Sequence, residues 1–283
     1  MLELNNVKKA YGKKVVLDNI NLSFDDPAGV YGILGRNGVG KTTLMGMITN
    51  AIVDYSGEIT YQGQSVKDNS EALSAMIYVG GIINNSDGLL NGKITNVIKT
   101  YAKFYPNFDQ AQADQLLERF NISKNAKFKT LSTGNKTLVQ NIIGLAAHTS
   151  ITILDEPTNG LDSVNRQIFF EYLMESYQTD PRLFILSTHL IQEVEPYLTH
   201  VIMLKATKVL LDTTLEEIQT QALRITQGPV ENKNVIKKQT LGSQEIYDIY
   251  DHLSDEERQK IISAGGSIEQ LGLQTLFNDW MEV

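Results

Sequence analysis

The pattern of apolar and polar residues changes its period along the chain. Residues 2–7 and 13–24 alternate apolar and polar positions, which predicts two half-buried strands with a turn at Tyr11-Gly12. Residues 58–66 alternate in the same way and predict another strand. Residues 42–52 show the helical spacing of apolar positions instead.

Short continuous apolar runs predict strands that are buried on both faces. These runs are GVYGILG, AMIYVGG, ITIL and RLFILST, and the first leads directly into the helical pattern that begins at residue 42. Residues 82–147 differ from them, because they form amphipathic helical patterns interrupted at Pro106-Asn107. A further helix follows, with Asp162 as its N-cap.

The pattern weakens after about residue 215. Two strand-like stretches, ALRITQG and NVIKKQTL, precede a helix that begins with a capping box of Ser254 and Glu257. Ser267 and Gln270 predict a second capping box before the last helix. The predicted fold is therefore α/β, with a main domain at 1–214, a helical subdomain at about 82–147 and a small α+β appendage at 215–283.

Composition excludes several classes of site. The chain has no cysteine, which excludes disulfides, thiolate zinc sites and cysteine nucleophiles. Its net charge of −8 argues against a primary nucleic-acid binder, and no nucleic acid is expected as a partner. Its apolar runs are shorter than the roughly 18 residues of a membrane helix, and its N-terminus lacks a secretory core. We therefore expect a soluble chain that reaches a membrane only through a partner.

Residues 35–43, GRNGVGKTT, match a phosphate-binding loop between a buried strand and a helix. Glycines allow backbone N–H groups to surround phosphate oxygens, and the helix N-terminus adds partial positive charge. Lys41 is placed to reach the β- and γ-phosphates, and Thr42 to ligate Mg²⁺. A glycine-rich turn that matches by chance is the alternative. The candidate nucleotide-binding residues of this loop are Gly35, Arg36, Asn37, Gly38, Val39, Gly40, Lys41, Thr42 and Thr43.

Two carboxylates and a histidine follow other buried strands. Asp155 and Glu156 end the run ITIL, where a parallel strand would direct Asp155 towards the metal and Glu156 towards the attacking water. His189 ends the strand FILST and is placed to donate to the γ-phosphate. The alternatives are a charged corner between strand and loop, and a histidine that only satisfies a local hydrogen bond.

Four motifs in this order, GRNGVGKTT, LSTGN, ITILDEPTNGLD and LSTH, resemble the nucleotide-binding subunit of ABC transporters over residues 1–215. The resemblance implies ATP and Mg²⁺ as cofactors. It implies that Tyr11 stacks on adenine and that Asp162 lies in a loop that crosses to a partner subunit. It also implies that Asp155 is the Mg²⁺-side carboxylate, that Glu156 is the catalytic carboxylate and that His189 is the switch histidine.

LSTGN, residues 131–135, resembles the signature sequence of that family, usually written LSGGQ. The resemblance implies head-to-tail docking of two ATPase subunits, identical or not, in which Ser132 and Gly134 of one subunit bind the γ-phosphate held by the other. Thr133 and Asn135 replace the usual glycine and glutamine. A simple N-cap role for Ser132 is the alternative.

Gly81 stands where the family usually has a glutamine that contacts the metal and the nucleotide. Asn84, Asn85 or Asp87 are candidates to replace it. This departure leaves the expectation of ATP binding unchanged and concerns the coupling to the membrane subunit.

FYPNFD and the C-terminal SIEQLGLQTLFNDW resemble a subgroup whose ATPase and membrane-spanning chains are separate, including bacterial exporters of antibiotics and peptides. The resemblance implies a cytoplasmic location, peripheral to the inner face of the membrane. The alternatives are a soluble ABC ATPase that acts on nucleic acid, ribosomes or cofactor assembly, and a P-loop protein that binds nucleotide only as a structural element.

Overall fold

The alternating segments at the N-terminus pair in an antiparallel sheet with the strand order β2-β1-β4-β5. In this computed structural model, which describes residues 1–80 and 92–282, β1 and β2 join at the predicted Tyr11-Gly12 turn. The strands are β1 (Leu2–Tyr11), β2 (Lys14–Phe24), β4 (Ser56–Tyr61) and β5 (Gln64–Ser65).

The apolar runs form a second sheet with the order β10-β9-β3-β8-β7-β6. Its strands are β3 (Val30–Leu34), β6 (Met76–Val79), β7 (Ile151–Asp155), β8 (Leu183–Thr188), β9 (His200–Lys205) and β10 (Lys208–Thr214). Parallel pairing joins β3 to β8, β8 to β7 and β7 to β6. Leu34 pairs with Thr188 and Asp155 pairs with Ser187, so the carboxyl ends of these three strands meet at one edge of the sheet.

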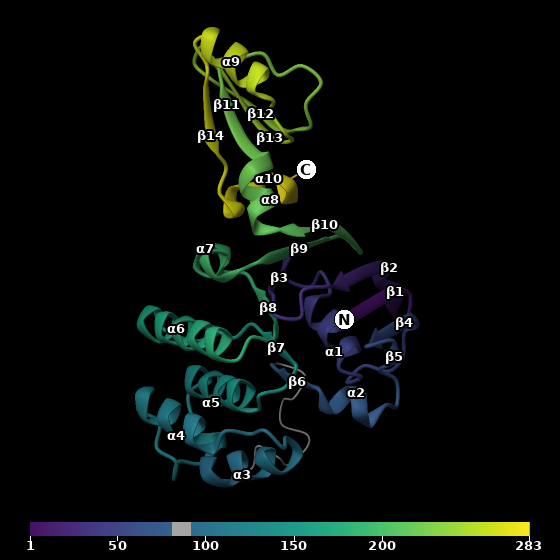
Figure 1. Ribbon diagram of the computed structural model, residues 1–283, viewed down its shortest axis with the longest axis vertical. Coiled ribbons are helices and arrows are strands. Elements are labelled where there is room, and N and C mark those ends of the chain that lie inside the picture. The colour runs from purple at the N-terminus through teal and green to yellow at the C-terminus, as the bar shows by residue number, and fades with distance from the viewer. Residues whose placement is uncertain (81–91, 283) are drawn as a thin grey trace. The chain divides into compact units, whose positions relative to one another are not determined.

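Both faces of this sheet are covered, which explains the continuous apolar character of its strands. Every residue of β3, β7 and β8 is buried. One side of β6, β7 and β8 is covered by α3 (Ile94–Phe104), α4 (Gln110–Arg119), α5 (Thr133–Ala146) and α6 (Ser163–Thr179) (Figure 1). Helix α1 (Lys41–Ile48) lies with the antiparallel sheet on the other side. Such two-sided burial is typical of parallel sheets.

The helical subdomain consists of α3 (Ile94–Phe104), α4 (Gln110–Arg119) and α5 (Thr133–Ala146). Helix α3 ends before Pro106, since a residue that precedes proline is disfavoured in helical geometry. Asp109 then caps α4 by accepting a hydrogen bond from the Gln112 backbone. Residues 82–91 of the predicted subdomain lie outside the described residues. Helix α6 (Ser163–Thr179) begins at its predicted cap, Asp162.

The chain divides into two compact units, and the division passes through β9 and β10. The first unit contains residues 1–189 and 202–212, and the second contains residues 190–201 and 213–283. The second unit has a sheet of order β12-β13-β11-β14 and its own small apolar core. Its elements are α7 (Ile191–Val194), α8 (Leu215–Gln221), β11 (Ala222–Thr226), β12 (Val235–Leu241), β13 (Gln244–Tyr250), α9 (Asp255–Ser263), β14 (Ser267–Gln270) and α10 (Leu273–Glu282).

One of the two predicted capping boxes is wrong. Ser254 and Glu257 form the box that begins α9, as predicted. Ser267 and Gln270 instead belong to β14, which pairs antiparallel with β11, and the last helix begins later, at Leu273. Pairing with β11 satisfies the backbone of these residues and lets Ile268 pack on the core of the second unit, which a local cap does not achieve.

Three further features differ from the pattern-based prediction. The predicted strand at 58–66 is a hairpin of β4 and β5, because Gln62 and Gly63 both have positive φ angles and reverse the chain. Strand β13 and the short helix α2 (Ser70–Ser74) were not predicted. Within residues 1–80 and 92–282, no helix combines the length and apolar character of a membrane span.

Candidate functional site

Residues 35–43 connect β3 to α1, as the phosphate-loop motif requires. A Cβ atom on Gly35 would lie 2.7 Å from Val39 Cγ1, so the loop closes tightly only with glycine there. Gly38 and Gly40 have φ angles of 80° and 116°, which favour glycine. No side chain caps the N-terminus of α1. Its backbone N–H groups are therefore available to an anion.

The exposed residues of the loop are Arg36, Asn37, Gly38 and Thr42, whereas Val39 and Thr43 are half-buried. Lys41 is 6% exposed, and its Nζ donates to the Gly35 carbonyl at 2.7 Å. Burial lowers the pKa of Lys41, and the charges of Glu156 and Asp155 oppose that shift. The ammonium group is thus held beneath the loop, 3.9 Å from Glu156 Oε1.

Asp155 accepts hydrogen bonds from hydroxyl groups of three different elements. Thr42 Oγ1 of α1 donates to Asp155 Oδ2 at 2.6 Å, and Tyr78 of β6 donates to the same oxygen at 2.9 Å. Ser187 of β8 donates to Oδ1. The Asp155 side chain is thereby oriented at the carboxyl end of β7, beside the start of α1.

Oxygen donors of this kind suit Mg²⁺. The hydroxyl of Thr42 and the carboxylate of Asp155 are hard ligands, and Mg²⁺ commonly binds through one carboxylate together with phosphate oxygens. No cluster of three or more His, Cys, Asp or Glu residues suited to a metal occurs in residues 1–80 and 92–282. The oxygen atoms of Thr42 and Asp155 fit as the protein ligands of an ion that also binds phosphate oxygens.

Glu156 turns away from its neighbour Asp155. Its φ angle is 53°, and its backbone N–H donates to Ser187 Oγ at 3.0 Å. Its Oε2 lies 2.7 Å from His189 Nδ1, while its Oε1 faces Lys41. Glu156 and His189 thus form a hydrogen-bonded pair at the same edge of the sheet as Lys41.

Ser132 and Gly134 lie at the start of α5. Ser132 is exposed, and its hydroxyl accepts from the Asn135 backbone at 3.2 Å, as the N-cap alternative requires. A Cβ on Gly134 would lie 2.4 Å from the carbonyl oxygen of Gly160. The loop of Gly160 leads to Asp162, which caps α6 through the Asn165 backbone at 2.8 Å. LSTGN and NGLD of one chain are therefore packed against each other.

Tyr11 ends β1 and is 51% exposed. The Nζ atom of Lys9 lies 4.7 Å from the centre of its ring and also pairs with Asp54. The exposed ring is thus held from one side by a cation, and this geometry is compatible with a base stacking on the other.

Pattern reasoning missed Tyr78 and Ser187. Each was visible as a hydroxyl-bearing residue in a buried strand, but only the tertiary structure brings both to Asp155. Gly80 was also missed: a Cβ there would lie 2.5 Å from Asp155 Cβ. Gly81, Asn84, Asn85 and Asp87, which concern the absent glutamine, lie outside the described residues.

Comparison with known proteins gives a consistent result. The family model described as ABC transporter matches residues 17–159. The ABC transporter ATP-binding protein YtrB of Bacillus subtilis is 25% identical, over 93% of this chain and 90% of that protein. The lantibiotic transport ATP-binding protein SrtF of Streptococcus pyogenes is 30% identical, over 69% of this chain and 82% of its own length.

A third relative is the phosphonates import ATP-binding protein PhnC 2 of Roseobacter denitrificans, which is 27% identical over 79% of this chain and 88% of its own length. The solved dimeric structure of MJ0796, a bacterial ABC transporter cassette, shares the fold with a TM-score of 0.65 at 24% identity, covering 76% of this chain and 99% of that one. The P-loop architecture, the motifs and these matches agree. The chain belongs to the ABC transporter family and is one of its ATP-binding, ATP-hydrolysing subunits.

Proposed function

We propose that this subunit powers export of peptides, antibiotics or similar compounds through membrane-spanning subunits on a separate chain. The relative SrtF, named for lantibiotic transport, supports this cargo class, and YtrB matches over both units of the chain. The subunit then lies on the cytoplasmic face of the membrane, bound to its partner. Residues 1–214 act as the ATPase domain and residues 215–283 as an accessory domain.

One observation carries the mechanism: Lys41, Asp155, Glu156 and His189 converge at the carboxyl ends of β3, β7 and β8. The loop 35–43 and Lys41 bind the phosphates, and Tyr11 stacks on adenine. Thr42 and Asp155 hold Mg²⁺, which neutralises phosphate charge when bound. Glu156 orients and polarises the attacking water, and His189 holds Glu156 and donates to the γ-phosphate.

Two ATPase subunits, identical or not, complete each site. Ser132 is exposed at the N-terminus of the 14-residue helix α5, where its hydroxyl and nearby backbone N–H groups suit a γ-phosphate. Gly134 permits the close packing of this helix start on Gly160, and Asp162 supports the same surface. ATP bound at the phosphate loop of one subunit is then closed over by LSTGN of the other.

Glu156→Gln tests this mechanism, because it keeps the side-chain shape and removes the charge and basicity. In the complete complex we expect ATP hydrolysis to fall about 100-fold or more while ATP remains bound and traps a closed dimer. Single-turnover hydrolysis and light scattering measure the two effects. Glu171→Gln, on an exposed position of α6, is the matched control. Wild-type hydrolysis in Glu156→Gln would contradict the assignment.

Transport itself is tested by purification of the tagged subunit from detergent-solubilised membranes. We expect a stoichiometric membrane-spanning subunit, and ATP-driven accumulation of a lantibiotic-like peptide in inside-out vesicles that contain the pair. Accumulation in right-side-out vesicles would indicate import, as the name of the relative PhnC 2 describes for phosphonates. Recovery without any membrane subunit would favour the soluble ABC ATPase instead.

A further inference from the structure

Tyr78 supplies a buried hydroxyl to the site although it lies outside every motif of the family pattern. It is 6% exposed, it belongs to the core of the first unit, and its hydroxyl donates to Asp155 Oδ2 at 2.9 Å. A carboxylate buried in this way needs donors, since an unpaired charge costs free energy in a core. Tyr78 therefore holds the side chain of Asp155, the last residue of β7, which is the proposed metal ligand.

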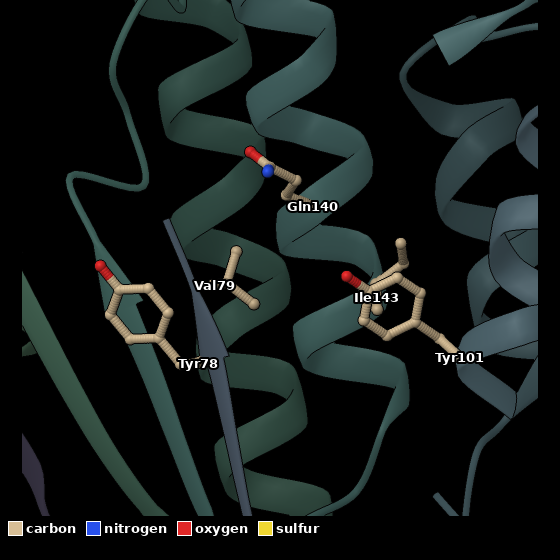
Figure 2. A pocket seen from close by; sticks show the side chains of 5 residues that line it. All are labelled: Tyr78, Val79, Tyr101, Gln140 and Ile143. Carbon is tan, nitrogen blue, oxygen red and sulfur yellow. The ribbon is translucent and has the colours of Figure 1, made fainter. Parts of the chain in front are cut away.

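The backbone of β6 determines where this hydroxyl goes. Successive side chains of a strand point to opposite faces. Val79 faces α5, where a Cβ on Gly144 would lie 2.7 Å from its Cγ2. The pocket in Figure 2 is lined by Tyr78, Val79, Tyr101, Gln140 and Ile143, and the hydroxyl of Tyr78 points away from the other four side chains. The ring of Tyr78 therefore extends towards α1 and Asp155, and the alternation of side chains along β6 sets this direction.

Tyr78 and Thr42 share one acceptor atom. Thr42 also donates to Asp155 Oδ2, at 2.6 Å. Because the proton of Thr42 points to Asp155, the lone pairs of its hydroxyl oxygen are left to face a cation. This arrangement persists only if Oδ2 stays in place. The hydroxyls of Tyr78 and Ser187 hold the carboxylate from β6 and β8, the two strands that flank β7.

We propose that Tyr78 is a positioning residue for the metal: its hydroxyl orients Asp155 so that Asp155 and Thr42 bind Mg²⁺ together. The proposal rests on the proposed function, in which these two residues hold the ion. Tyr78 touches neither nucleotide nor metal itself. Residues that orient metal ligands typically change metal affinity or activity by about 10- to 100-fold when they are removed.

Tyr78→Phe tests the proposal because it removes the hydroxyl and keeps the buried ring. At saturating ATP we expect the Mg²⁺ concentration for half-maximal hydrolysis to rise about tenfold. Nucleotide affinity measured in EDTA should stay at the wild-type value. Electron paramagnetic resonance of Mn²⁺ with ADP gives a readout that needs no turnover, and the variant should bind Mn²⁺ about tenfold more weakly.

Tyr55→Phe is the matched control. Tyr55 is also buried in the core of the first unit, and its hydroxyl has no hydrogen-bond partner among the described residues. Both variants lose one buried hydroxyl, and only Tyr78→Phe should change the metal dependence. Equal Mg²⁺ and Mn²⁺ titrations for Tyr78→Phe and Tyr55→Phe would overturn the proposal, as would tighter metal binding in Tyr78→Phe.

Asp155→Asn separates the inference from the proposed function. If Asp155→Asn leaves metal binding unchanged, the metal site itself is wrongly assigned. That result would overturn both the proposed metal role of Asp155 and the positioning role of Tyr78. If Asp155→Asn weakens metal binding while Tyr78→Phe behaves as wild type, only the role of Tyr78 is overturned. Weaker metal binding in both variants, with unchanged nucleotide affinity in EDTA, supports the proposal.

Discussion

At the scale of single residues, Asp155 and Glu156 are chain neighbours with different surroundings. Asp155 is 8% exposed and surrounded by hydroxyl donors, whereas Glu156 faces the cation of Lys41 and the ring of His189. The positive φ of Glu156 produces this separation, because it turns the chain sharply at the end of β7. Two adjacent carboxylates can thus serve a metal and a water separately.

Tyr11 gives a test at the same scale. If its exposed ring stacks on adenine, Tyr11→Ala should raise the KM for ATP about tenfold and lower kcat much less, since stacking contributes similarly before and during reaction. Tyr11→Phe keeps the ring and serves as the control, with a KM close to wild type. Equal nucleotide affinity in wild type and Tyr11→Ala would leave Tyr11 as an ordinary turn residue. Steady-state kinetics with ATP measures all three.

At the scale of elements, the start of α5 combines a structural and a proposed functional task. Ser132 caps the helix, and Gly134 allows it to pack against the Gly160 carbonyl before α6. A helix N-terminus with an exposed hydroxyl cap is also a suitable anion site. Capping alone needs only an oxygen acceptor, whereas binding a phosphate needs donors and no negative charge.

Two substitutions of Ser132 separate these tasks. Ser132→Ala should cost about 1 kcal/mol of stability through the lost cap, whereas Ser132→Asp should keep the cap and the stability. In the complete complex with Glu156→Gln, Ser132→Asp should nevertheless abolish ATP-dependent closure, because its carboxylate repels the γ-phosphate. Chemical denaturation and light scattering measure the two properties. Normal closure with Ser132→Asp would reduce LSTGN to a helix cap.

At the scale of the whole molecule, the chain has two units with separate cores. The second core is small, and beside it lies an ionic cluster on β11, β12, β13 and α10. Arg224 pairs with the buried Asp248 at 2.7 Å, and Lys237 pairs with the buried Asp279 at 2.9 Å and with Glu282. Burial raises the pKa of Asp279 above its ordinary value of 3.8; hydrogen bonding to Lys237 opposes the shift and nearby Asp248 adds to it.

This shift predicts how the stability of the second unit depends on pH. A raised pKa means that the folded state holds the proton more tightly than the unfolded state. The contribution of Asp279 is therefore fully present below its unfolded pKa and is lost as pH rises through the folded pKa. Asp279→Asn does not titrate, so its melting temperature relative to wild type should increase as pH rises above about 4.

Fluorescence of Trp280 reports this transition, since it is the single tryptophan of the chain and lies in α10 beside Tyr250. Asp68→Asn makes the same chemical change on an exposed loop residue and is the control. A difference between Asp279→Asn and wild type that stays constant with pH would contradict the assigned shift.

The sequence by itself determined the features that are local in the chain. Residues 35–43 are contiguous, so their glycines and Lys41 could be interpreted without neighbours. The buried strands were predictable because two-sided burial needs a continuous apolar run, and Asp162 and Ser254 were predictable because a cap acts within three residues.

Only the tertiary structure decided what depends on pairing between distant segments. Ser267 and Gln270 satisfy a local cap pattern, but β11 offers their backbone a full ladder and Ile268 a core, so they form β14. Tyr78 and Ser187 lie 77 and 32 residues from Asp155 in the chain, and no local pattern pairs either of them with it. The parallel register of β6, β7 and β8 brings them to one carboxylate, because strand register is set by packing and not by nearest neighbours.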